Sequence, residues 1–179
     1  MPFYLASTSP ARLATLRAAG IEPIAIAPGV DEEAAVAAAH PGLDGLIFGG
    51  DSAFEFDGTV YGKPHRPEIA RERWLAHRGR SGRLHSGHWL IDPRTGRAVG
   101  APAVATVNFA ADITDSEIDA YIATGEPLEV AGAFTIDAKG AAFIESIDGD
   151  PHAVVGLSIP LLRTLTRRLA IDWHDLWNR

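Results

Sequence analysis

Residues 49–64 read GGDSAFEFDGTVYGKP, and the pattern of this stretch indicates a β-hairpin. Apolar and aromatic residues lie on both sides of Asp57-Gly58, a residue pair that favours a tight turn between two antiparallel strands. We therefore expect strands over 46–56 and 59–61, joined at this pair. The hairpin is the point from which the rest of the fold can be worked out.

Two charges in the same stretch are not explained by folding alone. Asp51 ends a buried run, where a carboxylate without a partner is costly, and Lys63 stands between Gly62 and Pro64. The two glycines before Asp51 allow another backbone or a ligand to approach closely. The acid and the lysine are either an ordinary ion pair or a general base with a phosphate-binding cation, and spacing alone leaves both open.

Helix and strand signals alternate before this stretch, whereas strands dominate the middle of the chain. Ser9-Pro10 is typical of a helix start, and Thr114 to Glu117 form a capping box. Further strands are expected over 3–7, 21–27, 84–92, 98–111, 130–137 and 141–147. Helices are expected over 10–19, 31–40, 67–77, 115–124 and 160–169. This order predicts an α/β fold with a mixed, twisted sheet and flanking helices, in a single domain over 1–179.

The composition excludes several classes of protein. The 179 residues are enough for a substantial core, and the hydrophobic fraction of 46% is ordinary for a globular protein. A net charge of −7 argues against binding to polymeric nucleic acid, which depends on neutralising phosphates. The absence of cysteine excludes disulfides, thiolate catalysis and cysteine-ligated metals. No run suits a signal peptide or a membrane span, so we expect a cytoplasmic protein with no membrane partner.

The segment from Ser7 to Arg12 predicts an anion site. A strand leads into a hydroxyl-rich turn and then into the N-terminus of a helix, where free N–H groups and the helix dipole attract negative charge. Arg12 lies in the first helical turn, from which its guanidinium can bind a phosphate. The alternative is that Ser9 only caps the helix and that Arg12 is a solvated surface charge.

Acids and histidines elsewhere allow both structural and functional interpretations. Asp31, Glu32 and Glu33 begin an expected helix, where the dipole favours acids, but a carboxylate there can also hold Mg²⁺ or Mn²⁺. His85 and His88 are three apart in an expected strand and face opposite sides, which disfavours a shared metal site.

Taken in order, these segments resemble the Maf family of nucleoside triphosphate pyrophosphatases over nearly the whole chain. Each short motif is weak evidence alone, but their order is specific. The matching segments are Leu5-Ala6-Ser7-Thr8-Ser9-Pro10-Ala11-Arg12, Asp31-Glu32, Gly49-Gly50-Asp51-Ser52, Gly62-Lys63-Pro64, Tyr121-Ile122-Ala123-Thr124-Gly125-Glu126-Pro127, Ala131-Gly132-Ala133-Phe134 and Val154-Val155-Gly156-Leu157.

The resemblance implies a fold of two lobes around a cleft, similar to inosine triphosphate pyrophosphatases. It implies conversion of a nucleoside triphosphate to the monophosphate and pyrophosphate with a divalent cation, Mg²⁺ or Mn²⁺, and it suggests removal of modified or non-standard nucleotides. In that reaction Asp51 is the general base and a metal ligand, Glu32 is a second metal ligand, and Lys63 and Arg12 neutralise phosphate charge. The substrate-binding residues implied are Ser7, Ser9, Arg12, Ser52, Arg80 and Asp137. A homodimer is expected by analogy only.

The sequence departs from the family pattern at several of these positions. Ala11 replaces the first of two paired arginines, and Ser52 replaces a threonine but keeps the hydroxyl. Asp137 stands where glutamine is frequent, at a position that bears on base selection. Arg80 either contacts phosphate or only folds its loop.

Two other functions compete with the pyrophosphatase. One is a nucleotide-binding regulator of cell division with little turnover, for which Ala11 and Asp137 leave room. The other is a phosphohydrolase that acts on a different phosphoanhydride or on a sugar nucleotide. The products separate the three, because only the first releases pyrophosphate.

Overall fold

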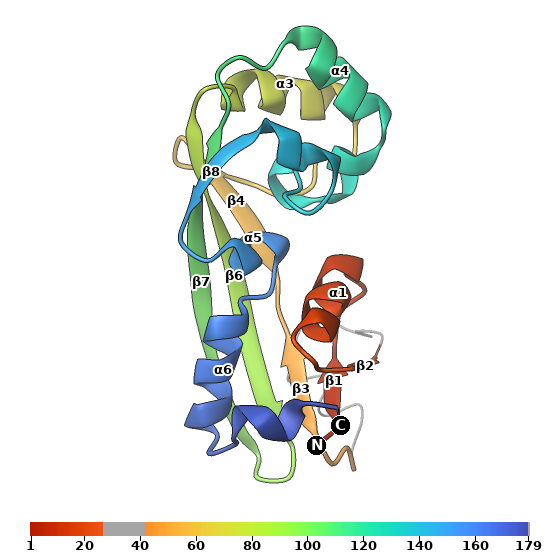
Figure 1. Ribbon diagram of the computed structural model, residues 1–179, viewed down its shortest axis with the longest axis vertical. Coiled ribbons are helices and arrows are strands. Elements are labelled where there is room, and N and C mark those ends of the chain that lie inside the picture. Colours follow the sequence, from red (N-terminus) through yellow and green to blue (C-terminus); the bar gives the residue numbers. More distant parts are fainter. Residues whose placement is uncertain (27–41, 179) are drawn as a thin grey trace. The chain divides into compact units, whose positions relative to one another are not determined.

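The computed structural model describes residues 1–26 and 42–178, and its strands form one open, mixed sheet (Figure 1). The strands are β1 (Phe3–Leu5), β2 (Ile24–Ala25), β3 (Leu46–Gly49), β4 (Ser52–Phe56), β5 (Thr59–Tyr61), β6 (Ser81–Asp92), β7 (Arg97–Phe109) and β8 (Ile144–Asp148). Strand β1 is parallel to β2 and β3, whereas β6 is antiparallel to β3 and β4. The α/β class with a mixed sheet and flanking helices is thus confirmed.

Three of the α-helices in the described part of the chain begin at a capping hydroxyl residue. The helices are α1 (Pro10–Ala18), α3 (Pro67–His77), α4 (Asp115–Ala123), α5 (Pro151–Val155) and α6 (Ile159–Arg168), with 3₁₀ helices η1 (Glu126–Glu129), η2 (Ala131–Ala133), η3 (Lys139–Phe143) and η4 (Trp173–Leu176). Ser9 caps α1, Thr114 forms the expected capping box with Glu117, and Ser158 caps α6. Each cap satisfies a backbone N–H that the helix leaves without an internal partner. The expected helix over 31–40 lies outside the described residues.

Strand β3 pairs with β6 in unit 1, and β4 pairs with β6 in unit 2. Gly49 lies opposite Trp89, and Ser52 lies opposite Ser86, so two residues lie between the paired positions on each strand. The expected single strand over 46–56 is therefore interrupted only at Gly50-Asp51, without a change of register. The hairpin between β4 and β5 is confirmed, with Asp57 and Gly58 both at positive φ, as its tight turn requires.

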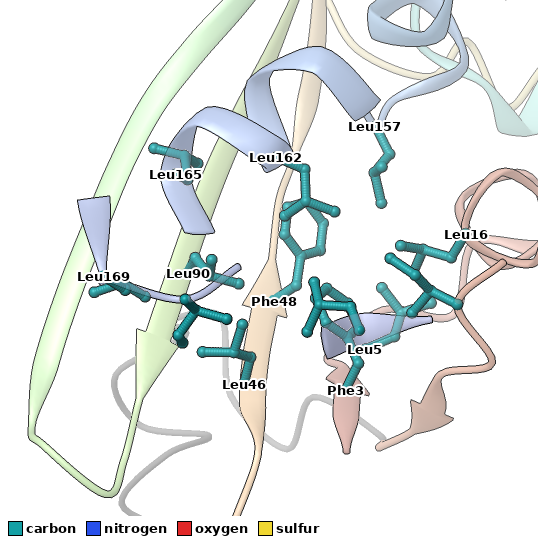
Figure 2. Packing of buried hydrophobic residues seen from close by; sticks show 13 residues of the cluster. Phe3, Leu5, Leu16, Leu46, Phe48, Leu90, Leu157, Leu162, Leu165 and Leu169 are labelled. Carbon is teal, nitrogen blue, oxygen red and sulfur yellow. The ribbon is translucent and has the colours of Figure 1, made fainter. Parts of the chain in front are cut away.

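The chain forms two compact units, each with its own core. Unit 1 comprises residues 1–51, 87–103 and 156–179, and unit 2 comprises residues 52–86 and 104–155, among the described positions. In unit 1, leucines of α6 pack with Phe48 of β3 and with β1 and α1 (Figure 2). In unit 2, α3 and α4 pack against each other and cover an aromatic core that includes Phe54, Trp74 and Phe109. The assignment of 1–179 as a single domain stays a prediction.

One expected strand, over 130–137, is wrong. The segment contains η2 instead, with Gly132 and Ala133 at positive φ, which no regular strand tolerates. A Cβ at Gly132 would lie 2.7 Å from the Phe54 ring, so the backbone itself packs against the core. The expected strand over 141–147 begins later, at Ile144, and η3 precedes it.

No helix within the described residues is long and apolar enough to cross a membrane.

Candidate active site

The turn from Ser7 to Arg12, in unit 1, is ordered by its own hydroxyl groups. The Ser9 hydroxyl accepts a hydrogen bond from the backbone N–H of Arg12 at 3.4 Å, and the Ser7 hydroxyl accepts one from the backbone N–H of Ser9 at 3.2 Å. Pro10 occupies the first helical position, where its missing N–H costs nothing. The expected capping role of Ser9 is confirmed.

The Arg12 side chain is buried, with only 9% of the residue exposed. Its Nε donates to the carbonyl of Gly156 at 2.9 Å, and an Nη donates to the Ser7 hydroxyl at 3.1 Å. The alternative of a solvated surface charge is therefore wrong. A buried guanidinium fixed at a helix N-terminus is a strong anion-binding arrangement, since the dipole and the cation act together.

The contact between Arg12 and Gly156 joins the first and the last of the sequence motifs, 144 residues apart. Nothing in the spacing of these motifs predicts the contact. Their order along the chain identifies both as parts of one family pattern, but it does not indicate that they touch.

His88 has a structural role in unit 1. Its Nε2 accepts a hydrogen bond from the backbone N–H of Ser158 at 2.7 Å, and the residue is 3% exposed. A backbone N–H can only donate, so Nε2 carries no proton. The side chain therefore helps to fix the start of α6, in agreement with the structural interpretation of this histidine.

Asp51 is the exposed last residue of unit 1 before β4. Its carbonyl accepts a hydrogen bond from the backbone N–H of Gly87 at 2.8 Å. A Cβ at Gly50 would lie 2.5 Å from the Gly87 carbonyl oxygen, so only glycine fits before Asp51. The expected close approach of another backbone is confirmed, and β6 is that backbone.

Ser52 begins unit 2, and its hydroxyl lies 2.9 Å from the hydroxyl of Ser86. Ser86 is fully buried and donates to the carbonyl of Ala153 at 2.7 Å. Because the single hydroxyl proton of Ser86 points to that carbonyl, Ser52 is the donor in the pair of hydroxyls. Sequence reasoning missed this buried link between β4, β6 and α5.

Lys63, the predicted catalytic lysine, lies in unit 2 beside an acid that the sequence analysis did not single out. Its Nζ is 3.9 Å from a carboxylate oxygen of Glu129, whose other oxygen is 3.2 Å from Nδ1 of His65. All three side chains are more than half exposed, so these ion pairs contribute little to stability. The loop itself is fixed, because the Gly62 carbonyl accepts from Arg73 at 2.6 Å.

Arg80 and Asp137 also lie in unit 2. An Nη of Arg80 donates to Asp57 at 2.5 Å, and the guanidinium lies 4.6 Å from the centre of the Phe56 ring. Arg80 therefore helps to fold the hairpin turn. Asp137 is exposed, on the segment between Thr135 and η3.

The structure thus assembles part of the predicted site within each unit. Unit 1 brings together Ser7, Ser9 and Arg12 and also contains Asp51. Unit 2 contains Ser52, Lys63, Arg80 and Asp137.

The predicted metal ligands are only partly visible. Glu32 lies outside the described residues, and the described residues contain no group of three acids or histidines that could hold a metal. A Mg²⁺ ion that is bound mainly through substrate phosphates needs only one or two protein carboxylates. Glu32 and Asp51 meet that number and supply the oxygen donors that a hard cation prefers.

Comparison with known proteins gives similarity over the full length. A relative from Leifsonia xyli subsp. xyli, named nucleoside triphosphate pyrophosphatase, is 60% identical over 211 aligned positions, which cover 100% of this chain and 98% of the relative. One from Salinispora tropica with the same name is 49% identical, over 98% of this chain and 87% of the relative. A nucleoside triphosphate pyrophosphatase/Nudix hydrolase fusion protein from Bifidobacterium longum is 50% identical, over 84% of this chain and 32% of that protein.

The alignment with the Leifsonia relative also shows that this chain is shorter within the aligned region. The chain has 179 residues for 211 aligned positions, so at least 32 positions, the difference between the two, have no residue here.

The family profile described as Maf-like protein matches residues 34–169. That match covers most of the chain, and it includes β3 to β8 together with Asp51 and Lys63. The Ser7–Arg12 turn lies before it, but within the region that the full-length relatives share. The chain belongs to the Maf family.

Proposed function

We propose that this protein hydrolyses a nucleoside triphosphate to the nucleoside monophosphate and pyrophosphate. The buried Arg12 at the N-terminus of α1 is the observation that carries the proposal, because it is a prepared anion site in a chain whose relatives are named nucleoside triphosphate pyrophosphatases. We also propose that the enzyme acts in the cytoplasm, and that its role is the removal of modified or non-standard nucleotides. We also propose that it acts as a homodimer, by analogy with its family.

In the proposed reaction a water oxygen attacks the α-phosphorus. Asp51 accepts the proton of the water, a bond forms between that oxygen and the α-phosphorus, and the bond from the α-phosphorus to the bridging oxygen breaks. Pyrophosphate leaves with the bonding electron pair. Asp51 is suited to this role because the residue is exposed and its own backbone carbonyl is held by the N–H of Gly87.

The cations would stabilise charge on the phosphates. Arg12 is fixed by two hydrogen bonds before substrate arrives, so little reorganisation is needed. The exposed pair of Lys63 with Glu129 is weak enough for a phosphate to replace Glu129 as partner of the ammonium. Ser7 and Ser9 would supply polar contacts beside Arg12, and Ser52 and Arg80 would contact substrate in unit 2.

A divalent cation, held by Glu32 and Asp51 together with substrate phosphates, would neutralise phosphate charge. Mg²⁺ and Mn²⁺ both suit oxygen donors of this kind.

The second candidate is a nucleotide-binding regulator with little turnover. Two observations favour it. This chain lacks at least 32 of the positions aligned with the Leifsonia protein, and Ala11 stands where the family pattern has an arginine. Such a protein would bind nucleotides through Arg12 and release no product.

The products of a nucleotide panel test the proposal. Ordinary and modified nucleoside triphosphates are incubated with Mg²⁺ or Mn²⁺, and pyrophosphate and orthophosphate are measured separately, with Asp51→Asn as the matched variant. We expect pyrophosphate from one or a few nucleotides, and none from the variant, which should still fold. Orthophosphate as the first product would contradict the proposal, and binding without any product would favour the regulator.

A further inference from the structure

The turn from Gly156 to Ser158, in unit 1, connects two side chains from distant parts of the sequence. Arg12 of α1 donates to the carbonyl at one end of the turn, that of Gly156, at 2.9 Å. His88 of β6 accepts from the backbone N–H at the other end, that of Ser158, at 2.7 Å. The turn therefore links a residue that we propose to bind phosphate to a histidine that has no part in the proposed reaction.

Contacts with the rest of unit 1 hold the turn in place. Gly156 has a φ of +103°, a conformation that favours glycine. Leu157 is fully buried and belongs to the same core cluster as Phe48 (Figure 2). The Ser158 hydroxyl caps α6 by accepting from the backbone N–H of Leu161 at 3.1 Å. The side chains of the turn are thus engaged in packing and capping, and the Ser158 N–H is engaged separately by His88.

The Ser158 N–H needs an acceptor inside the protein. The residue is 2% exposed, and a buried backbone N–H without a partner destabilises a fold. His88 supplies the acceptor at Nε2, so its imidazole is neutral and carries its proton on Nδ1. The ring itself packs edge-on against Phe48, with 5.5 Å between the ring centres. His88 therefore offers the turn a fixed acceptor.

The Gly156 carbonyl in turn sets the orientation of the Arg12 guanidinium. Nε of Arg12 donates to this carbonyl, and an Nη donates to the Ser7 hydroxyl. The two acceptors come from opposite ends of the sequence, so both must be in place to define the plane of the guanidinium. Because a guanidinium binds phosphate through a planar fork of N–H donors, its orientation affects affinity as well as its charge does.

We propose that His88 is a positioning residue for phosphate binding by Arg12, since its neutral imidazole holds the turn whose carbonyl orients the guanidinium. This inference rests on the proposed function for the role of Arg12. His88 acts through the turn and needs no contact with the phosphate. The alternative is that the bond from Ser158 to His88 only stabilises the start of α6, in which case its loss leaves anion binding unchanged.

The test measures anion binding without turnover. The dissociation constant of inorganic triphosphate is measured in the presence of Mg²⁺ for the wild type, for His88→Leu, which removes the acceptor, and for His88→Gln, whose side-chain oxygen can take the place of Nε2. We expect His88→Leu to weaken binding about tenfold and His88→Gln to stay within about twofold of the wild type. In an Arg12→Lys background, His88→Leu should weaken binding by less than about twofold, because both residues act through one link.

A second measurement follows the Arg12 side chain directly. Exchange of its Nε–H proton with solvent, measured by NMR, should be faster in His88→Leu than in the wild type. Leu165→Val is the matched control, because Leu165 is fully buried on α6 and the lost methylene lowers stability without removing a hydrogen bond from the turn. This control should keep the wild-type affinity for triphosphate and the wild-type exchange rate at Arg12.

Each outcome decides the inference. It is overturned if the wild type binds no triphosphate, if His88→Leu binds it as tightly as the wild type, or if Leu165→Val weakens binding as much as His88→Leu does. Should His88→Leu fail to fold, His88→Asn replaces it, because its shorter polar side chain ends before the position of Nε2. That variant must weaken binding, or the inference fails.

The same measurements separate this inference from the proposed function. Triphosphate binding that depends on His88, in a protein that releases no pyrophosphate from any nucleotide, would support the inference and reject the proposed catalytic function. Release of pyrophosphate, with no effect of His88→Leu on binding, would overturn the inference and leave the proposed function standing.

Discussion

His77 is a polar side chain in an apolar, aromatic environment. It is fully buried in unit 2, its ring stacks on Phe109 at 4.8 Å, and neither ring nitrogen has a hydrogen-bond partner within the described residues. Burial first, and then the charges of Arg73 and Arg80, lower its pKa from 6.5 to about 3. The histidine is therefore neutral in the folded protein at any ordinary pH.

This burial makes stability depend on pH. In the unfolded chain His77 takes up a proton as the pH falls below 6.5, but in the folded protein it does so only near 3. Stability from this group is thus complete above pH 6.5 and is lost between pH 6.5 and about 3. Between pH 7 and pH 5 we expect the free energy of unfolding to fall by about 2 kcal/mol on this account.

Chemical denaturation of His77→Leu at both pH values checks this prediction. The variant should lose less stability than the wild type over that range, whereas His174→Gln, at an exposed histidine, should behave like the wild type. Equal losses in wild type and His77→Leu would show that His77 is not held neutral.

At the scale of elements, the junction of β3 and β4 depends on glycine. The glycine required is Gly50, because a Cβ there would lie 2.5 Å from the Gly87 carbonyl oxygen of β6, whereas a Cβ at Gly87 would lie 3.8 Å from the nearest atom, the Asp51 carbonyl oxygen. The backbone of Asp51 is consequently held by the hydrogen bond that its carbonyl accepts from Gly87.

Gly50→Ala tests the junction. Its Cβ would collide with the Gly87 carbonyl oxygen, so we expect a loss of about 1–3 kcal/mol in the free energy of unfolding. Gly62→Ala is the control, because a Cβ there meets no atom within 4 Å and should change stability little. A neutral Gly50→Ala would mean that β6 moves away at no cost.

Local signals predict those elements that local chemistry determines. The caps at Ser9 and Thr114 and the turn at Asp57-Gly58 depend on neighbouring residues, and all were predictable. The composition of residues 130–137 favours a strand. Tertiary contacts override that preference, because Gly132 packs against the ring of Phe54 and the Thr135 hydroxyl donates to Glu126.

For the whole molecule, the contacts of the proposed site residues could not be predicted from the sequence. The motif order proposes Arg12 as a phosphate-binding residue, but the burial of Arg12 against Gly156 depends on the return of the chain to unit 1 after residue 155. The pairing of Lys63 with Glu129 likewise joins the segment after β5 to η1, through tertiary packing that no local sequence pattern predicts.

Each unit has its own core, and each holds part of the predicted machinery. The anion site at Arg12 and the proposed base Asp51 belong to unit 1, and Lys63 and Asp137 belong to unit 2. The function proposed for these residues depends on one chemical step, in which water attacks the α-phosphorus and pyrophosphate leaves.

The most direct test is hydrolysis in ¹⁸O-labelled water, followed by mass spectrometry of both products. We predict one labelled oxygen in the nucleoside monophosphate and unlabelled pyrophosphate, with neither product formed by Asp51→Asn. Label in the pyrophosphate, or a nucleoside diphosphate with labelled orthophosphate, would place the attack at another phosphorus and contradict the account.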